Sequence, residues 1–186
     1  MTKRNTLHLL IVLTCLSLLA ASAVAAQGTL RTRVDPRVAG VFIDGKYHGT
    51  AAMFSHHQAA IKLEAGTYTV KLVDPMHEDM TMDVGITAGK ETTIRQRMKP
   101  LNIPKREKLG ELETDDWGNA AIYLNGKYYA NSNELDHPSY SLLLDPGEYN
   151  MKLVPVDGSK GREGKITIKE NQTLVLAKGG ADTYRK

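Results

Sequence analysis

The chain repeats itself, and this repeat constrains the fold more than any other feature. Residues 39–47 read AGVFIDGKY, and residues 120–128, offset by 81 positions, read AAIYLNGKY. The same offset places residues 66–73 (GTYTVKLV) on residues 147–154 (GEYNMKLV). Apolar, turn and polar residues match in one register without a gap. We therefore expect two copies of one supersecondary unit in tandem.

Each copy has the pattern of short β-strands. Runs of strand formers end at Asp44-Gly45 in the first copy and at Asn125-Gly126 in the second. These dipeptides are typical of type I′ hairpin turns, in which both central residues need a positive φ. Residues 68–72 and their counterparts alternate between apolar and polar side chains, as a half-buried strand does. The sequence predicts an all-β fold: two small tandem antiparallel β-sandwich modules, with about seven short strands each.

Residues 1–26 have the three parts of a cleaved secretory signal peptide. Lys3 and Arg4 precede an apolar run at 9–20, which leads into small residues. A signal anchor, or a lipoprotein modified at Cys15, are the alternatives. Cleavage would leave no cysteine for a disulfide and no other apolar run of transmembrane length. We expect a periplasmic or extracellular protein without a transmembrane helix in its mature chain.

A proline-containing, charged stretch divides the rest of the chain. Residues 99–108 (KPLNIPKREK) hold two prolines and four bases against one acid, which is typical of a stiff linker. We therefore expect a first module at 27–98 and a second at 109–180. Residues 181–186 are expected to be a flexible tail.

The charge balance limits the choice of partners. The chain has 24 Lys and Arg against 21 Asp and Glu, and the predicted signal peptide removes two of the bases, Lys3 and Arg4. A nucleic-acid-binding protein normally carries a clear positive excess, so nucleic acid is not expected as a partner. We expect a monomer.

The turn and strand residues of the first copy resemble the PEGA domain family. The resemblance rests on three motifs: Pro36-x-x-Ala39, Asp44-Gly45-Lys46-x-x-Gly49-Thr50 and Leu63-x-x-Gly66-x-Tyr68-x-Val70. The second copy departs from the first motif, with Trp117-Gly-Asn-Ala120. The resemblance implies a compact β-sandwich of envelope and surface proteins that occurs as single or tandem modules. It also implies a usually non-enzymatic role, with no catalytic residues to carry over.

Histidines and acids give weak signals for chemistry. The first copy holds His48, His56, His57 and His77, but none shows the His-x-His or His-x-x-x-His spacing of a metal site. The acids lack the alternating pattern of a calcium loop. A Gly-x-Ser-x-Gly nucleophile motif is also missing from the sequence. We expect no catalytic residues, no metal site and no cofactor, and hence a protein that is not an enzyme.

Aromatic residues near the hairpin turns give a stronger signal for binding. A tyrosine joins an apolar face to a hydroxyl group, which suits contact with sugars or protein surfaces. Packing across neighbouring strands is the alternative for these rings. The candidate ligand-binding residues are Lys46, Tyr47, Trp117, Lys127, Tyr128 and Tyr129.

Together these features predict a non-catalytic exported protein of the cell envelope that acts as a binding module or spacer. Its hairpin loops would contact cell-wall polysaccharide or an envelope protein. Two similar modules could add avidity if both engage one partner. The alternative is a periplasmic metal-binding protein that uses the histidines of the first module.

Overall fold

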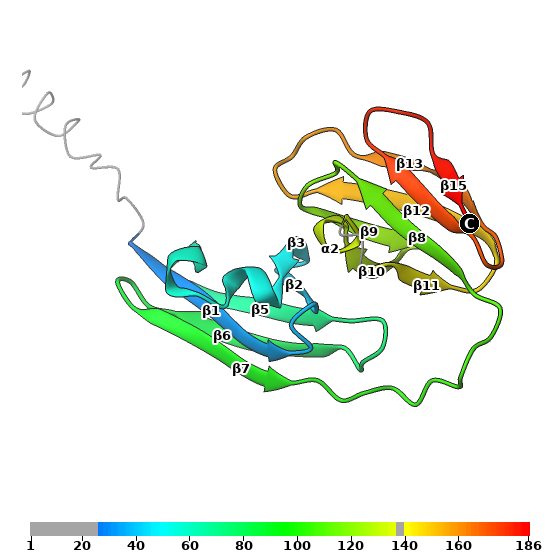
Figure 1. The fold of residues 1–186 in the computed structure, drawn as a ribbon. Coiled ribbons are helices and arrows are strands. Elements are labelled where there is room, and N and C mark those ends of the chain that lie inside the picture. Colours follow the sequence, from blue (N-terminus) through cyan, green and yellow to red (C-terminus); the bar gives the residue numbers. More distant parts are fainter. Residues whose placement is uncertain (1–25, 137–139) are drawn as a thin grey trace, which may run out of the picture.

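The computed structural model describes residues 26–136 and 140–186 (Figure 1). Apart from Ala26, the predicted signal peptide lies outside these described residues. The first module contains β1 (Gln27–Asp35), β2 (Gly40–Ile43), β3 (Lys46–Thr50), β4 (Ile61–Glu64), β5 (Gly66–Val73), β6 (Met80–Ile86) and β7 (Glu91–Arg97). Two short 3₁₀ helices, η2 (Ala51–Phe54) and η3 (His57–Ala59), lie between β3 and β4.

The second module follows the same order of strands and adds one, β15, at its C-terminal end. Its strands are β8 (Gly110–Asp115), β9 (Ala120–Leu124), β10 (Lys127–Asn131), β11 (Leu142–Leu144), β12 (Gly147–Pro155), β13 (Arg162–Ile168), β14 (Thr173–Ala177) and β15 (Thr183–Arg185). A single turn of helix, α2 (Ser132–Leu135), stands where η2 stands in the first module. The predicted all-β class is therefore confirmed.

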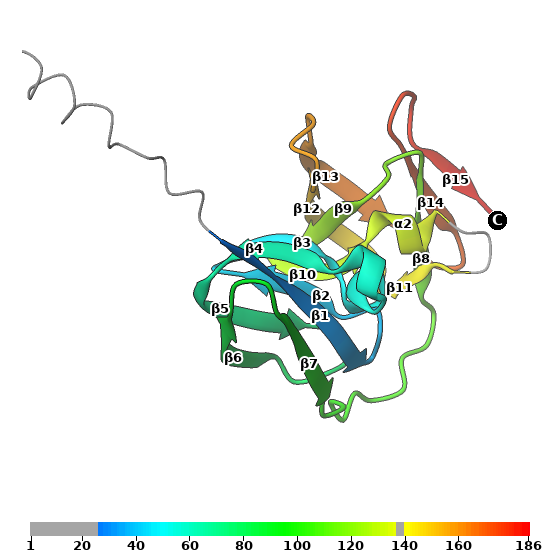
Figure 2. The same cartoon turned by 90° about the vertical axis from the view of Figure 1, so that its left-hand side faces the viewer.

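Each module packs two sheets over one apolar core (Figure 2). The first module pairs its strands in the orders β4-β1-β7 and β3-β2-β5-β6, and the second in the orders β11-β8-β14-β15 and β10-β9-β12-β13. Leu30, Val41 and Leu72 are fully buried in the first core. Leu112 and Ile122 belong to a separate second core. Inward apolar side chains from both sheets thus build each sandwich.

One strand pair in each module departs from the predicted antiparallel pattern. β1 and β7 run parallel over Thr29–Asp35, and β8 and β14 repeat this arrangement. Parallel neighbours need a long connection instead of a tight turn. Here the connection is nearly the whole module, because β1 opens it and β7 closes it. The alternation of side chains along a strand carries no information on which distant strand pairs with it, or in which direction.

The two predicted hairpin turns are confirmed. Asp44 and Gly45 have φ angles of 49° and 79°, and Asn125 and Gly126 have φ angles of 50° and 78°. In each turn the first side chain also tethers the neighbouring strand. Asp44 Oδ1 accepts a hydrogen bond from the backbone N–H of Thr69, and Asn125 Oδ1 accepts one from Asn150, both at 2.9 Å.

The C-terminal residues are a strand and not the predicted flexible tail. β15 pairs with β14, and the Tyr184 hydroxyl donates a hydrogen bond to the carbonyl of Thr167 at 2.6 Å. Arg185 forms an ion pair with Glu113 of β8. The polar sequence of this segment does not predict the strand, because the segment is held by backbone pairing with the edge strand β14 and not by an apolar face of its own.

The segment between the modules contacts both of them. Leu101 donates a backbone hydrogen bond to Met76 of the first module. Arg106 approaches Asp145 and the carbonyl of Leu143 in the second module, at 3.4 and 3.5 Å. In the described part of the chain, helices are too short or too polar to cross a membrane.

Candidate binding site between the modules

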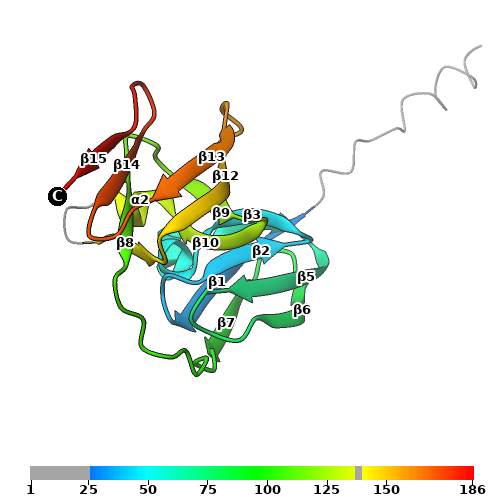
Figure 3. The same ribbon diagram turned by 90° about the vertical axis from the view of Figure 1, so that its right-hand side faces the viewer.

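The two modules meet through their hairpin strands. β2 contacts β10 and β3 contacts β9, as Figure 3 shows. These are reciprocal contacts, because β9 and β10 are the second-module counterparts of β2 and β3. The same patch of each module therefore faces the other, as in an isologous interface between two subunits.

Equivalent tyrosines lie at the centre of this interface. Tyr47 and Tyr128 are 6% and 4% exposed, and their ring centroids lie 5.3 Å apart. Phe42 lies 5.2 Å from the ring of Tyr47 and 5.5 Å from that of Tyr128, edge-on to the latter. Val73 and Ala121 complete the buried cluster. Aromatic contacts at this spacing stabilise an interface beyond the area they bury.

A glycine makes room for the second tyrosine. A Cβ atom on Gly40 would lie 2.8 Å from two ring carbons of Tyr128. The residue at the equivalent position in the second module is Ala121, which is fully buried in the same cluster. Equivalent strands thus meet in the interface, but the residues at equivalent positions differ.

Hydrogen bonds satisfy the polar atoms of the interface. The Tyr47 and Tyr128 hydroxyl oxygens lie 3.4 Å apart. Asn131 Nδ2 donates to the Tyr47 hydroxyl at 2.7 Å and to Asn119 Oδ1 at 2.5 Å. Burial raises the pKa of both tyrosines well above the usual range, so both remain neutral phenols.

One carboxyl group at the edge of the interface has a pKa near neutral pH. Burial raises the pKa of Glu134, in α2 of the second module, to about 7. A hydrogen bond with Thr50 of the first module opposes this rise, and the negative charge of Asp74 adds to it. Glu134 therefore links the modules through a contact that depends on its protonation.

A groove of about 570 Å³ lies beside the tyrosine cluster. Tyr123 supplies a partly exposed ring and the buried Phe42 and Tyr128 contribute their edges. The groove also reaches the two hairpin turns at Gly45 and Gly126. Its polar lining includes Thr69, Thr81, Lys127 and the ion pair between Lys71 and Asp79, whose atoms are 2.7 Å apart. Aromatic rings combined with hydroxyl and charged groups suit a polar ligand with apolar faces, such as a sugar.

The structure places three of the predicted binding residues in packing positions. Tyr47 and Tyr128 pack against each other and not at a free hairpin surface. Trp117 is 5% exposed in the second core, and its Nε1 donates a hydrogen bond to the carbonyl of Leu176 at 3.1 Å. The sequence reveals equivalent hairpins but not that they pack together, so their rings looked available.

The other predicted residues lie nearer to solvent. Lys46 and Lys127 are exposed, and Lys127 lines the groove. Tyr129 is partly buried and lines a second cavity of about 360 Å³ beside Met76 and Leu142. Ligand contact by these three side chains stays a prediction.

The sequence reasoning missed Phe42 and Tyr123 as lining residues. A signal for them was present, because residues 40–43 are apolar or small at every position instead of alternating. A strand with two apolar faces packs on both sides. In the first module, the outer side of β2 packs on the second module.

The histidines of the first module lie in separate settings. His57 pairs with Glu91, and His77 pairs with Asp74 at 2.6 Å. Burial and the nearby Lys46 lower the pKa of His48. Within residues 26–136 and 140–186, His, Cys, Asp and Glu side chains form no group of three that could hold a metal ion.

Comparison with known proteins connects the first module with a family. The family model of the PEGA domain matches residues 27–102. No curated protein matches the chain. Among solved structures, the Bacillus anthracis TIE protein is similar, with 17% sequence identity and a TM-score of 0.30. That match covers 82% of this chain and 33% of the other, so the chain spans about a third of the length of that protein.

Proposed function

Residues 27–102 belong to the PEGA domain family, and from this premise we propose that the protein is a non-catalytic binding module of the cell envelope. PEGA is a non-catalytic domain family whose members occur in extracellular or periplasmic proteins. The ligand that we propose is cell-wall polysaccharide, held in the groove between the modules. An envelope protein is the alternative partner.

The groove carries this proposal. It combines the partly exposed ring of Tyr123 and the edges of the buried Phe42 and Tyr128 with hydroxyl groups and a lysine, in one concave surface of about 570 Å³. Sugars present apolar C–H faces and a rim of hydroxyls, so they can stack on tyrosine and bond to threonine and lysine at once. Lys127 is the one predicted binding residue that lines this groove while remaining exposed.

The buried tyrosine cluster supports a second aspect of the role, that of a spacer. Two modules joined by the linker alone would move independently. Instead, five side chains are buried between them. A fixed angle between the modules keeps the two walls of the groove in place. It would also fix the distance between partners bound at the two ends of the protein.

Co-sedimentation with isolated cell-wall material tests the ligand class. Pelleting that survives protease treatment of the wall material is expected for polysaccharide binding. Pelleting that disappears after the treatment would assign the groove to a protein partner instead. Absence of pelleting in both cases would leave the spacer role alone and would contradict the binding proposal.

Two tryptophan substitutions on the same sheet locate the contact. Thr81→Trp fills the groove from an exposed position on β6, and we expect it to reduce pelleting strongly. Thr67→Trp is the matched control, since Thr67 is exposed on β5 but outside the groove. Equal pelleting by both folded variants would exclude the groove as the binding site.

A further inference from the structure

The first module carries positive charge on the outward face of the β4-β1-β7 sheet. Leu30, Thr32 and Val34 of β1 are buried, so the alternate residues Arg31 and Arg33 face outward. The register of the sheet places outward bases of the two neighbouring strands beside them: Lys62, Arg95 and Arg97. The near-neutral total of the chain conceals this local concentration of charge.

Two of these arginines lie side by side on neighbouring strands. Arg33 of β1 is paired in register with Arg95 of β7. Their neighbours are neutralised, since Arg31 pairs with Glu91 at 3.0 Å and Arg97 with Asp35 at 3.2 Å. In the described part of the chain, no carboxylate forms an ion pair with Arg33 or Arg95. Like charges side by side on a sheet are unfavourable, and a bound anion would relieve them.

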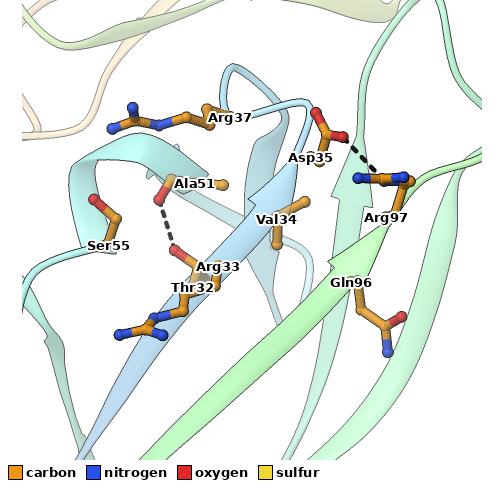
Figure 4. Close-up of a pocket in the computed structure, with 9 residues that line it drawn as sticks. All are labelled: Thr32, Arg33, Val34, Asp35, Arg37, Ala51, Ser55, Gln96 and Arg97. Carbon is orange, nitrogen blue, oxygen red and sulfur yellow. Dashed lines mark hydrogen bonds and ion pairs between the residues drawn. The ribbon is translucent and has the colours of Figure 1, made fainter.

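A pocket of about 420 Å³ opens beside Arg33. Arg33, Arg37 and Arg97 line it together with Ser55, and Thr32 closes its floor by donating a hydrogen bond to the carbonyl of Ala51 at 2.7 Å. In Figure 4, Arg33 and Arg37 extend on either side of Ser55, and Arg97 turns toward Asp35. Two guanidinium groups therefore remain available at this concave surface.

The second module has a pocket at the equivalent place, with a mainly acidic lining. There Thr114 donates its hydroxyl hydrogen bond to the carbonyl of Ser132, as Thr32 does to Ala51. The lining of that pocket includes Asp115 and Asp136 where the first module has Arg33 and Ser55, and its one base, Arg185, is paired with Glu113. The two modules are therefore alike in fold and unlike in what this pocket can bind, which argues against avidity for one shared ligand.

We propose that the arginine pocket of the first module binds the oxyanion groups, carboxylate or phosphate, of an acidic polysaccharide. Planar guanidinium groups bind such anions through paired N–H donors. The volume suffices for about one sugar unit with its acidic group. This site lies apart from the groove between the modules and does not depend on a ligand there.

The surroundings of the pocket favour a glycan over a lipid surface. A protein that docks on a membrane normally adds exposed apolar side chains to its basic residues. The large exposed apolar residue nearest in sequence is Val38, and it lines a cavity with Asn133 and Glu134 of the second module. Val38 is itself 46% exposed, but one apolar side chain does not make the apolar patch that membrane docking needs.

Isothermal titration of the purified protein with polygalacturonate tests the proposal, with neutral dextran as the uncharged probe. We expect binding of polygalacturonate that weakens as salt rises, and none of dextran. Arg33→Ala combined with Arg37→Ala should lower the affinity at least about tenfold, since charge-assisted hydrogen bonds are lost. Replacing polygalacturonate by polyphosphate shows which oxyanion the pocket prefers.

Two controls make the result decisive. Asp115→Asn changes the equivalent pocket, and Thr67→Trp changes an exposed residue outside both the arginine pocket and the groove, so neither should weaken binding at the arginine pocket. Unchanged affinity in a double arginine variant with an unaltered melting temperature would overturn the proposal. Stronger binding to phosphatidylglycerol vesicles than to either polymer would also overturn it, in favour of a membrane.

Discussion

Tyr47 and Tyr128 occupy equivalent positions in the two modules and pack against each other, with their hydroxyl oxygens 3.4 Å apart. Each ring belongs to a hairpin strand whose sequence is repeated in the other module. The repeat therefore supplies both sides of its own interface. A patch that faces its own counterpart needs no separate complementary partner, which is why closed two-fold contacts are common in oligomers. Here the two patches are joined in one chain.

Truncating one of these tyrosines should release the modules from each other. Tyr128→Ala removes a buried ring and leaves a cavity, at a cost of about 3 kcal/mol. We expect the radius of gyration from small-angle X-ray scattering to rise and a shared thermal transition to separate into two. Leu143→Ala, at an exposed site on β11, is the control and should change neither. A Tyr128→Ala protein with wild-type scattering would show that the cluster does not hold the modules together.

The hydroxyl of Tyr47 makes a smaller contribution. Tyr47→Phe keeps the ring but leaves Asn131 Nδ2 with one acceptor fewer, so we expect a loss of about 1 kcal/mol in the free energy of unfolding. Urea denaturation measures it. Tyr184→Phe removes a hydroxyl whose hydrogen bond, to the carbonyl of Thr167, is exposed to solvent, and it serves as the control for a bond outside the buried network. A larger loss in the control than in Tyr47→Phe would contradict the role given to the buried network.

Much of this fold could be predicted from the sequence because its information is local. The Asp44-Gly45 and Asn125-Gly126 turns are fixed by the φ angles that their residues tolerate. The alternation along 68–72 fixes one buried face. Both patterns depend only on residues close together in the sequence, so the positions of the strands can be predicted from them.

The candidate site was harder to predict because its residues come together through long-range packing. The groove joins β2, β5 and β6 of one module with β9 and β10 of the other. The repeat marks Tyr47 and Tyr128 as equivalent but does not show that they touch, so the sequence alone predicts both rings at a free surface. The basic face escaped notice for a related reason: Arg33 and Arg95 are 62 residues apart and become neighbours only through parallel pairing.

Gly40 and Gly85 offer a matched pair of glycine-to-alanine substitutions. Gly40→Ala would place a methyl group 2.8 Å from the ring of Tyr128, so the ring or the strand must shift. We expect it to weaken contact between the modules by about 1 to 3 kcal/mol, as overpacking does. Gly85→Ala, on β6 with open space around its Cα, provides the control. Denaturation curves that shift equally for Gly40→Ala and Gly85→Ala would contradict the steric argument.

Trp117 tests the second core independently of the interface. Trp117→Phe removes the Nε1 donor and leaves the carbonyl of Leu176 without this hydrogen bond. Together with the lost volume, we expect about 2 kcal/mol of destabilisation. Unfolding followed by circular dichroism measures the loss. Because Trp117 is in the second core and not in the buried cluster between the modules, the scattering profile of the folded variant should stay unchanged.

Glu134 should make the contact between the modules depend on pH. The carboxyl group titrates near 4.5 in an unfolded chain and near 7 in the folded protein, where burial disfavours its charge. Between these values the folded state holds more protons than the unfolded state, so stability falls as pH rises through this window. Because the side chain is partly exposed, solvent screening limits the effect to about 1 kcal/mol. Thermal unfolding measured from pH 4.5 to 8 should show this decline. Glu134→Gln should flatten it, since a neutral amide does not titrate, whereas Glu64→Gln removes an exposed carboxylate and should leave the slope intact. An unchanged slope in Glu134→Gln would show that another group sets the pH dependence.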